Sequence, residues 1–111
     1  MGSRLLGRRV RERREALRLT QPELADLLKT DVKQILRWEK EQTDPGSSIV
    51  AALVVALRTS ADYLFGYTDN PAPDYKSEDL SDEERQLILA VRNRNAGQAV
   101  RILANLTQDP K

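Results

Sequence analysis

The 111 residues include neither cysteine nor histidine. Without cysteine the chain has no disulfides, no thiolate nucleophile and no cysteine-based metal site. Without histidine it also lacks the commonest general base and the commonest metal ligand. No pair of acids clusters on one face of an expected helix. These absences argue against an enzyme, and we expect neither a metal nor a cofactor.

Long apolar runs and strand-like patterns are missing as well. No apolar stretch approaches the ~18 residues of a membrane span, and Leu5 and Leu6 are too few for a signal peptide. We therefore expect a cytoplasmic protein with no membrane partner. Aromatic residues make up only 5%, and β-branched residues never alternate over the length of a strand. Hydrophobic residues, at 40%, suffice for a modest core, so we predict an all-α fold.

Charge is unevenly distributed although the net charge is only +1. Residues 1–20 hold seven arginines against two glutamates, and the segments that follow are mildly acidic or balanced. A concentration of positive charge on the first expected helix is what a polyanion such as DNA attracts. A solvated, salt-bridged helix face would produce the same pattern, so charge supports DNA binding without establishing it.

The segment from Thr20 to Glu39 contains two short helical patterns with a three-residue break between them. Thr20 is placed to cap the first helix, with Glu23 as its capping-box partner. Asp31 is placed to cap the second, and the i, i+3 spacing of Ile35 and Trp38 marks its buried face. Two helices joined this tightly must cross steeply, which outlines a helix-turn-helix with its second helix directed at the DNA major groove.

The remaining elements follow from caps and apolar spacing. We expect helices over 5–17, 21–28, 32–40, 49–57 and 61–65, with arginines outside on the first and a serine at 47 or 48 capping the fourth. A proline-containing polar run then predicts a linker. The chain divides into a domain over 1–67, a linker over 68–80 and a tail of two helices over 81–111, the first opened by a capping box at Ser81 and Glu84.

Residues 8–66 closely resemble the DNA-binding domain of the XRE/Cro/lambdoid-repressor helix-turn-helix family. The resemblance lies in RREALRLTQPELA, ILRWE, Pro45 and ALVVALRTSADYLFG, which occur in the family's order and with its loop lengths. It implies a five-helix lambda-repressor-like domain that binds duplex DNA. The residues that the resemblance and the charge pattern assign to DNA contact are Gln21, Val32, Lys33, Gln34, Arg37, Arg11 and Lys40.

Arg14 and Glu39 match a pair that bridges the first and third helices in some members, and we expect the bridge here to orient helix 32–40. The chain also departs from the family. Lys29 occupies the position of the usual turn glycine, Thr30 that of an apolar residue, and Lys40-Glu41 that of Asn-Gly. A non-glycine residue with positive φ is uncommon, so the turn is expected to be strained or reshaped. Glu41 is expected near the DNA backbone, where it would repel phosphate.

The tail lies outside the resemblance. Its two amphipathic helices fold back on the domain, pair with a second copy, or bind another protein, and the residues alone leave all three open. Pairing suits DNA recognition, because two copies reach half-sites about 34 Å apart. The apolar residues that would make such a contact are Leu87, Ile88, Val91, Val100, Leu103 and Leu106.

We therefore predict a sequence-specific regulator of transcription, a repressor that binds double-stranded operator DNA as a homodimer with helix 32–40 in the major groove. The main alternative is an antitoxin-like protein whose C-terminal helices hold a partner, with DNA binding secondary. An enzyme is the weakest hypothesis, because the chain contains no histidine and no cysteine, which are common active-site residues.

Overall fold

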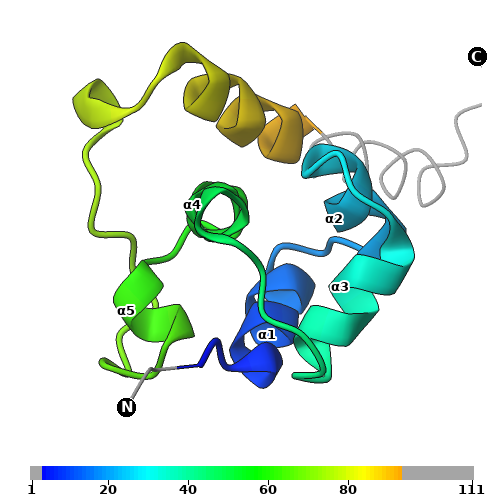
Figure 1. Ribbon diagram of the computed structural model, residues 1–111. Coiled ribbons are helices and arrows are strands. Elements are labelled where there is room, and N and C mark those ends of the chain that lie inside the picture. Colours follow the sequence, from blue (N-terminus) through cyan, green and yellow to red (C-terminus); the bar gives the residue numbers. More distant parts are fainter. Residues whose placement is uncertain (1–3, 94–111) are drawn as a thin grey trace, which may run out of the picture.

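The computed structural model describes residues 4–93, and within them every regular element is helical (Figure 1). The helices are α1 (Gly7–Ala16), α2 (Gln21–Leu27), α3 (Val32–Glu39), α4 (Ser47–Ala56) and α5 (Ala61–Leu64). A 3₁₀ turn η1 (Ser77–Asp79) precedes a further helix over residues 82–93. The all-α prediction is confirmed for this range. None of the described helices is long and apolar enough to cross a membrane.

Side-chain caps begin most of the helices where the sequence predicts them. The Thr20 hydroxyl accepts from the backbone N–H of Glu23, whose carboxylate accepts from the N–H of Thr20. Asp31 caps α3 and Ser60 caps α5 through a side-chain oxygen that accepts from the N–H three residues on, without the reciprocal bond. The prediction for α4 is wrong. Its N-cap is Gly46, without a side-chain bond, so both candidate serines lie inside the helix, where an N-cap residue cannot be.

Helices α1 to α5 all end in a left-handed residue, and only the last of these is glycine. The others are Arg18, Lys29, Glu41 and Arg58, with φ between 52° and 60°. In each case two backbone N–H groups bond back to the last turn, as the N–H of Lys29 does to Asp26 at 3.2 Å. Lys29 thus adopts the left-handed conformation that glycine accepts more readily than other residues, and the turn between α2 and α3 is closed by bonds from the N–H groups of Lys29 and Thr30.

A single apolar core unites these helices. Val10, Leu24, Ile35, Leu53 and Leu64 are fully buried in it. Helix α3 packs against α1 and α2, and α5 packs against α1 and α4. Trp38 is 5% exposed, which confirms its interpretation as core. The core therefore leaves only one side of α3 facing outward.

The N-terminus of α1 abuts the C-terminus of α3. A β-carbon at Gly7 would overlap the carbonyl oxygens of Trp38 and Glu39, so only glycine allows this approach. The Gly7 N–H donates to the Glu41 carboxylate at 3.0 Å, and Arg4 donates to the Glu41 carbonyl. The positive end of one helix thus meets the negative end of another, with an added carboxylate, which is a favourable arrangement of dipoles. Glu41 thus has a structural partner 34 residues away in the chain, which local sequence patterns do not predict.

The segment after α5, which the sequence predicts to be a linker, is attached to the domain. Arg9 donates to the Thr68 carbonyl at 2.6 Å and to Asp69 at 2.7 Å. The buried Thr59 hydroxyl donates to the Pro71 carbonyl at 2.7 Å. This polar strap, residues 67–74, leads to η1 and to the helix over 82–93, which Ser81 and Glu84 open with the predicted capping box.

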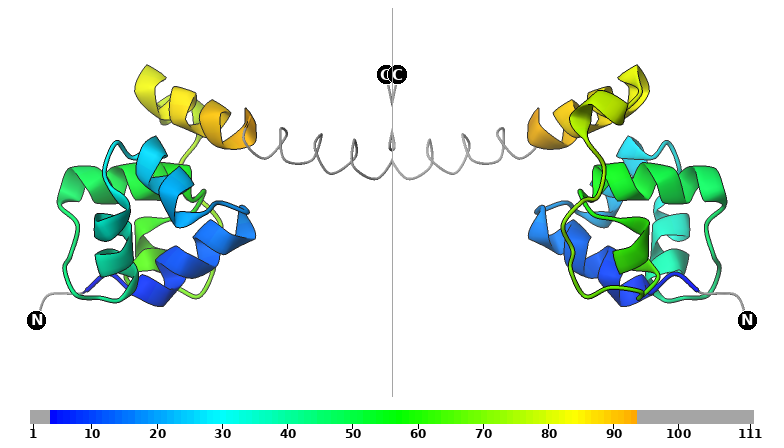
Figure 2. Two further views of the ribbon diagram at one scale, coloured as in Figure 1. Left: turned by 90° about the vertical axis from the view of Figure 1, so that its right-hand side faces the viewer. Right: turned by 90° about the vertical axis from the view of Figure 1, so that its left-hand side faces the viewer.

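The helix over 82–93 lies across the domain above α2 and α4 (Figures 1 and 2). Val91 is 1% exposed and belongs to the core, and Leu87 packs against it. Of the expected tail contacts, these two therefore face the chain's own domain, because the helix folds back upon it. Ile88 is half-buried. The remaining three, Val100, Leu103 and Leu106, lie outside the described residues, as does the second tail helix.

Candidate nucleic-acid interface

The outward side of α3 is formed by a short run of exposed side chains. Val32, Lys33, Leu36 and Arg37 are exposed, and Lys40 follows directly at the helix end. These positions face outward because Ile35 and Trp38 turn the opposite side of the helix into the core, with Gln34 and Glu39 partly buried beside them. Four of the seven predicted DNA contacts, at positions 32, 33, 37 and 40, therefore share one surface.

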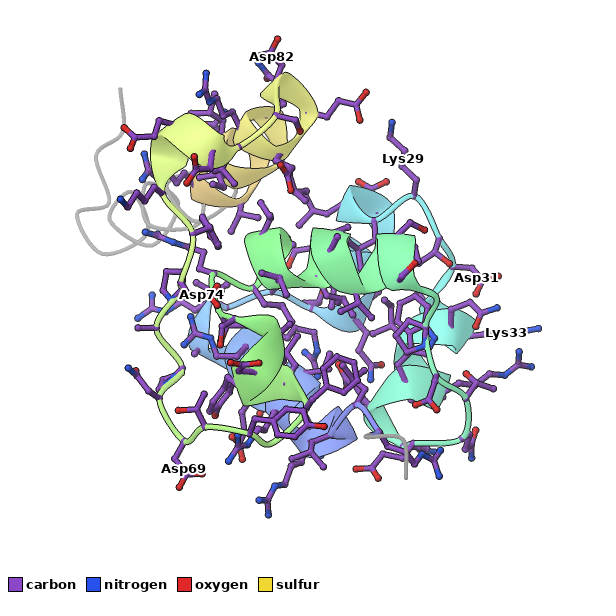
Figure 3. All side chains as sticks on the ribbon, turned by 60° about the vertical axis from the view of Figure 1, so that its left-hand side comes forward. Lys29, Asp31, Lys33, Asp69, Asp74 and Asp82 are labelled. Atoms are coloured by element: carbon purple, nitrogen blue, oxygen red, sulfur yellow. The ribbon has the colours of Figure 1, made fainter. Side chains whose placement is uncertain are left out.

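The three cationic side chains of this surface, Lys33, Arg37 and Lys40, are not paired with carboxylates in the described residues. Lys33 extends away from the body of the protein next to Asp31, with Lys29 farther up in the same view (Figure 3). The acids Asp69 and Asp74 lie on the other side of the domain in the same view. The surface is thus a local concentration of positive charge on a chain that is nearly neutral overall.

A buried polar network fixes α3 against α1. The Arg14 guanidinium donates to both carboxylate oxygens of Glu39, at 2.6 and 3.1 Å, and the two side chains are 10% and 5% exposed. Arg14 also donates to the carbonyl of Leu19, which lies between α1 and α2. A bidentate pair with so little exposure holds both helices at one relative angle, although its net contribution to stability need not be large. The predicted partners are brought together.

Gln21 joins this network at the start of α2. Its Nε2 donates to Glu39 Oε1 at 3.1 Å. Because a carboxylate only accepts, the amide must present its nitrogen to Glu39, which leaves Oε1 and one N–H for other partners. The sequence places Gln21 at the DNA surface but gives no sign of this bond, since the two residues are far apart in the chain.

The arginines of α1 have different roles from those expected. Arg9 is buried, stacks over the Tyr63 ring with its Cζ atom 4.2 Å from the centroid, and donates to the Tyr63 carbonyl. Arg13 donates to the carbonyls of Leu57 and Arg58. Both thus neutralise the C-terminal ends of neighbouring helices. The expectation that the arginines of this helix face outward is wrong for Arg9 and Arg14, because backbone carbonyls and a buried carboxylate accept hydrogen bonds from them on the inner side.

The two remaining predicted contacts lie in less favourable positions. Arg11 is exposed on α1 and pairs with Glu15 at 3.4 Å, a weak surface interaction that an outside anion can displace. Gln34 is half-buried and its backbone N–H is taken by Asp31. The described residues also contain no cluster of acids that could hold a metal ion. The structure therefore concentrates the candidate site on α3 and the start of α2.

The comparisons with known proteins match the part of the chain that contains this surface. The helix-turn-helix family matches residues 10–64. A 64-residue stretch is 36% identical to "Repressor protein C2" of Salmonella phage P22 and covers 58% of this chain. It spans only 30% of that protein. No solved structure matches significantly.

Proposed function

Because residues 10–64 of this chain belong to the helix-turn-helix family of phage-repressor-like proteins, we propose that the protein binds operator DNA and represses transcription. In this proposal α3 enters the major groove of a specific duplex sequence and blocks access of RNA polymerase. The observation that carries it is the exposed run of cations on α3, none of them in an ion pair within residues 4–93.

Each residue of the surface has a chemistry that fits one part of the duplex. Arg37 and Lys33 suit guanine O6 and N7, and Gln34 suits adenine. Lys40, at the end of α3, suits a phosphate. Gln21 retains one N–H and its Oε1 beyond its bond to Glu39, so it can reach a phosphate or a base.

We also propose that two copies bind together. A single helix in the groove reads only a few base pairs, whereas a twofold pair reads two half-sites about 34 Å apart. The contact between copies is assigned to the C-terminal region, whose outer side carries Leu89, 46% exposed, beside Ile88.

The second candidate function is a partner-binding protein in which the C-terminal region holds a different protein. The exposed side chain of Leu89 also favours this candidate.

Selection of bound duplexes from a random-sequence DNA pool tests the proposal. A palindromic consensus with half-sites one helical turn apart supports a dimeric operator-binding protein. The absence of any enriched sequence, with binding that vanishes at moderate salt, would refute operator recognition and favour the partner-binding role.

The role of α3 is tested on the selected duplex. Arg37→Ala should cost about 1–3 kcal/mol of binding and flatten the preference at one base pair. Arg92→Ala serves as the control, because Arg92 is also exposed but lies on the helix over 82–93. An equal loss on every sequence would instead make Arg37 a phosphate contact.

Arg11 is expected to contact the backbone only. Arg11→Ala should then weaken binding to all sequences alike and lower the slope of log affinity against log salt by about one. An unchanged slope would show that α1 stays away from phosphate.

A further inference from the structure

Two of the four large apolar side chains exposed in the described residues lie together on α3. Val32 is 38% exposed and Leu36 is 37% exposed. They are four residues apart, so they lie on successive turns of the same side of the helix. The other two, Tyr67 and Leu89, lie outside α3. We refer to Val32 and Leu36 as the apolar pair of α3.

Exposure alone does not indicate that the pair binds a ligand, since single exposed leucines are common on proteins. The residues that surround the pair indicate more. Ile35 and Trp38 supply what α3 contributes to the core, so Leu36 is not required there. Lys33, Arg37 and Lys40 border the pair, and within residues 4–93 none of them has a carboxylate partner. An apolar strip edged by cations complements a surface that combines negative charge with small apolar groups.

The major groove of DNA is such a surface. Its phosphates are negative, and its base edges carry one apolar group, the 5-methyl of thymine. We infer that Leu36 is a further specificity-determining residue, which contacts a thymine methyl together with Val32. This inference rests on the proposed function, and it adds a preference for thymine at a base pair adjacent to those reached by Lys33 and Arg37.

Replacing single thymines by deoxyuridine in the selected duplex tests the contact. Deoxyuridine keeps the base pair and removes only the methyl group. Loss of one buried methyl contact corresponds to about three- to fivefold weaker binding. At one or more positions, wild-type protein should lose this factor, whereas Leu36→Ala, which keeps only the Val32 contact, should lose a clearly smaller factor at the same positions.

Two further variants separate this contact from a general effect of the substitution. Leu89→Ala makes the same change at an exposed leucine outside α3 and should retain the full sensitivity to deoxyuridine. Leu36→Met keeps an apolar side chain and should retain most of it. Thermal unfolding of each variant checks that the fold is intact.

The outcomes distinguish failure of the proposed operator binding from failure of the role assigned to Leu36. If the pool yields no preferred duplex, the proposed function fails and this inference fails with it. If a preferred duplex is found but Leu36→Ala keeps the same deoxyuridine sensitivity as wild type, or wild type shows none, operator binding stands and the role of Leu36 is refuted. A preferred duplex without thymine under α3 has the same meaning.

Discussion

Replacing Lys29 with glycine should stabilise the domain. Lys29 has φ +57° and an exposed side chain, and the turn that it forms is closed by bonds from its own N–H and from the N–H of Thr30. Holding a residue with a β-carbon in this conformation costs roughly 1–2 kcal/mol. Glycine avoids that cost but loses about 0.5–1 kcal/mol more conformational entropy on folding. We expect a net gain of about 0.5–1 kcal/mol.

Urea and thermal unfolding, followed by circular dichroism, measure this gain. For a domain of this size it corresponds to a rise in Tm of about 2–8 °C. Lys29→Ala removes the charge but keeps the β-carbon, so it should give no gain. Lys33→Gly, within α3, should instead lose about 0.5–1 kcal/mol. If Lys29→Gly is no more stable than Lys29→Ala, the left-handed conformation is not a source of strain and the reasoning fails.

Glu41 provides a contrast at the end of α3. It has φ +60°, so the same backbone argument applies to Glu41→Gly. Its carboxylate, however, accepts from the Gly7 N–H at 3.0 Å, and glycine cannot replace that bond. The lost cap, about 1 kcal/mol, should cancel the gain. A stabilisation equal to that of Lys29→Gly would show that the bond to Gly7 contributes nothing.

Three further predictions follow from the packing. Gly7→Ala should destabilise the domain by about 3 kcal/mol in urea unfolding, because a β-carbon would collide with the end of α3; unchanged stability would refute that close approach. Arg9→Ala should cost about 2–3 kcal/mol, since it removes a buried guanidinium that donates to the Tyr63 and Thr68 carbonyls and stacks on the Tyr63 ring, whereas Asp69→Ala should cost less than about 1 kcal/mol, because that side chain is 98% exposed; equal losses would contradict this division. Burial raises the pKa of Tyr75 above its normal value of 10.0, so folding favours the neutral phenol. The stability that Tyr75 contributes is therefore fully present below pH 10 and is lost as the pH rises through the folded-state pKa. Unfolding between pH 8 and 11 should therefore show a smaller alkaline loss for Tyr75→Phe than for wild type, and identical pH profiles would contradict the shift.

The parts of the fold that could be predicted depend on residues close together in the chain. The caps at Thr20, Asp31 and Ser60 each bond to a group three residues on, and the structure contains all three. The capping box at Ser81 is equally local. Serines at 47 and 48 satisfied the same pattern but lie inside α4, because the helix begins at Ser47 with Gly46 as its N-cap. Local patterns thus predict that a helix begins more reliably than they predict the residue at which it begins.

The candidate site depends both on local spacing along α3 and on contacts between residues far apart in the chain. The outward positions of α3 follow from its spacing, since burial of Ile35 and Trp38 leaves the lysines and arginine outside. Which cations remain available does not follow from spacing. Arg9 and Arg14 resemble the other arginines of α1 in the sequence, yet each reaches a partner at least 25 residues away. The charge of the N-terminal segment therefore overstates the number of arginines that are available on the surface.

By itself, the sequence determined the helical class, the order of the helices and which side of α3 is polar, because apolar spacing and caps act within one or two turns. Only the tertiary structure decided which arginines are buried, that Gln21 shares Glu39 with Arg14, and that Val91 packs into the core. The physical reason is the distance along the chain over which each interaction acts. A helix is stabilised by bonds to its neighbours in the chain, whereas the position of a guanidinium depends on which unpaired carbonyls and carboxylates folding brings within its reach.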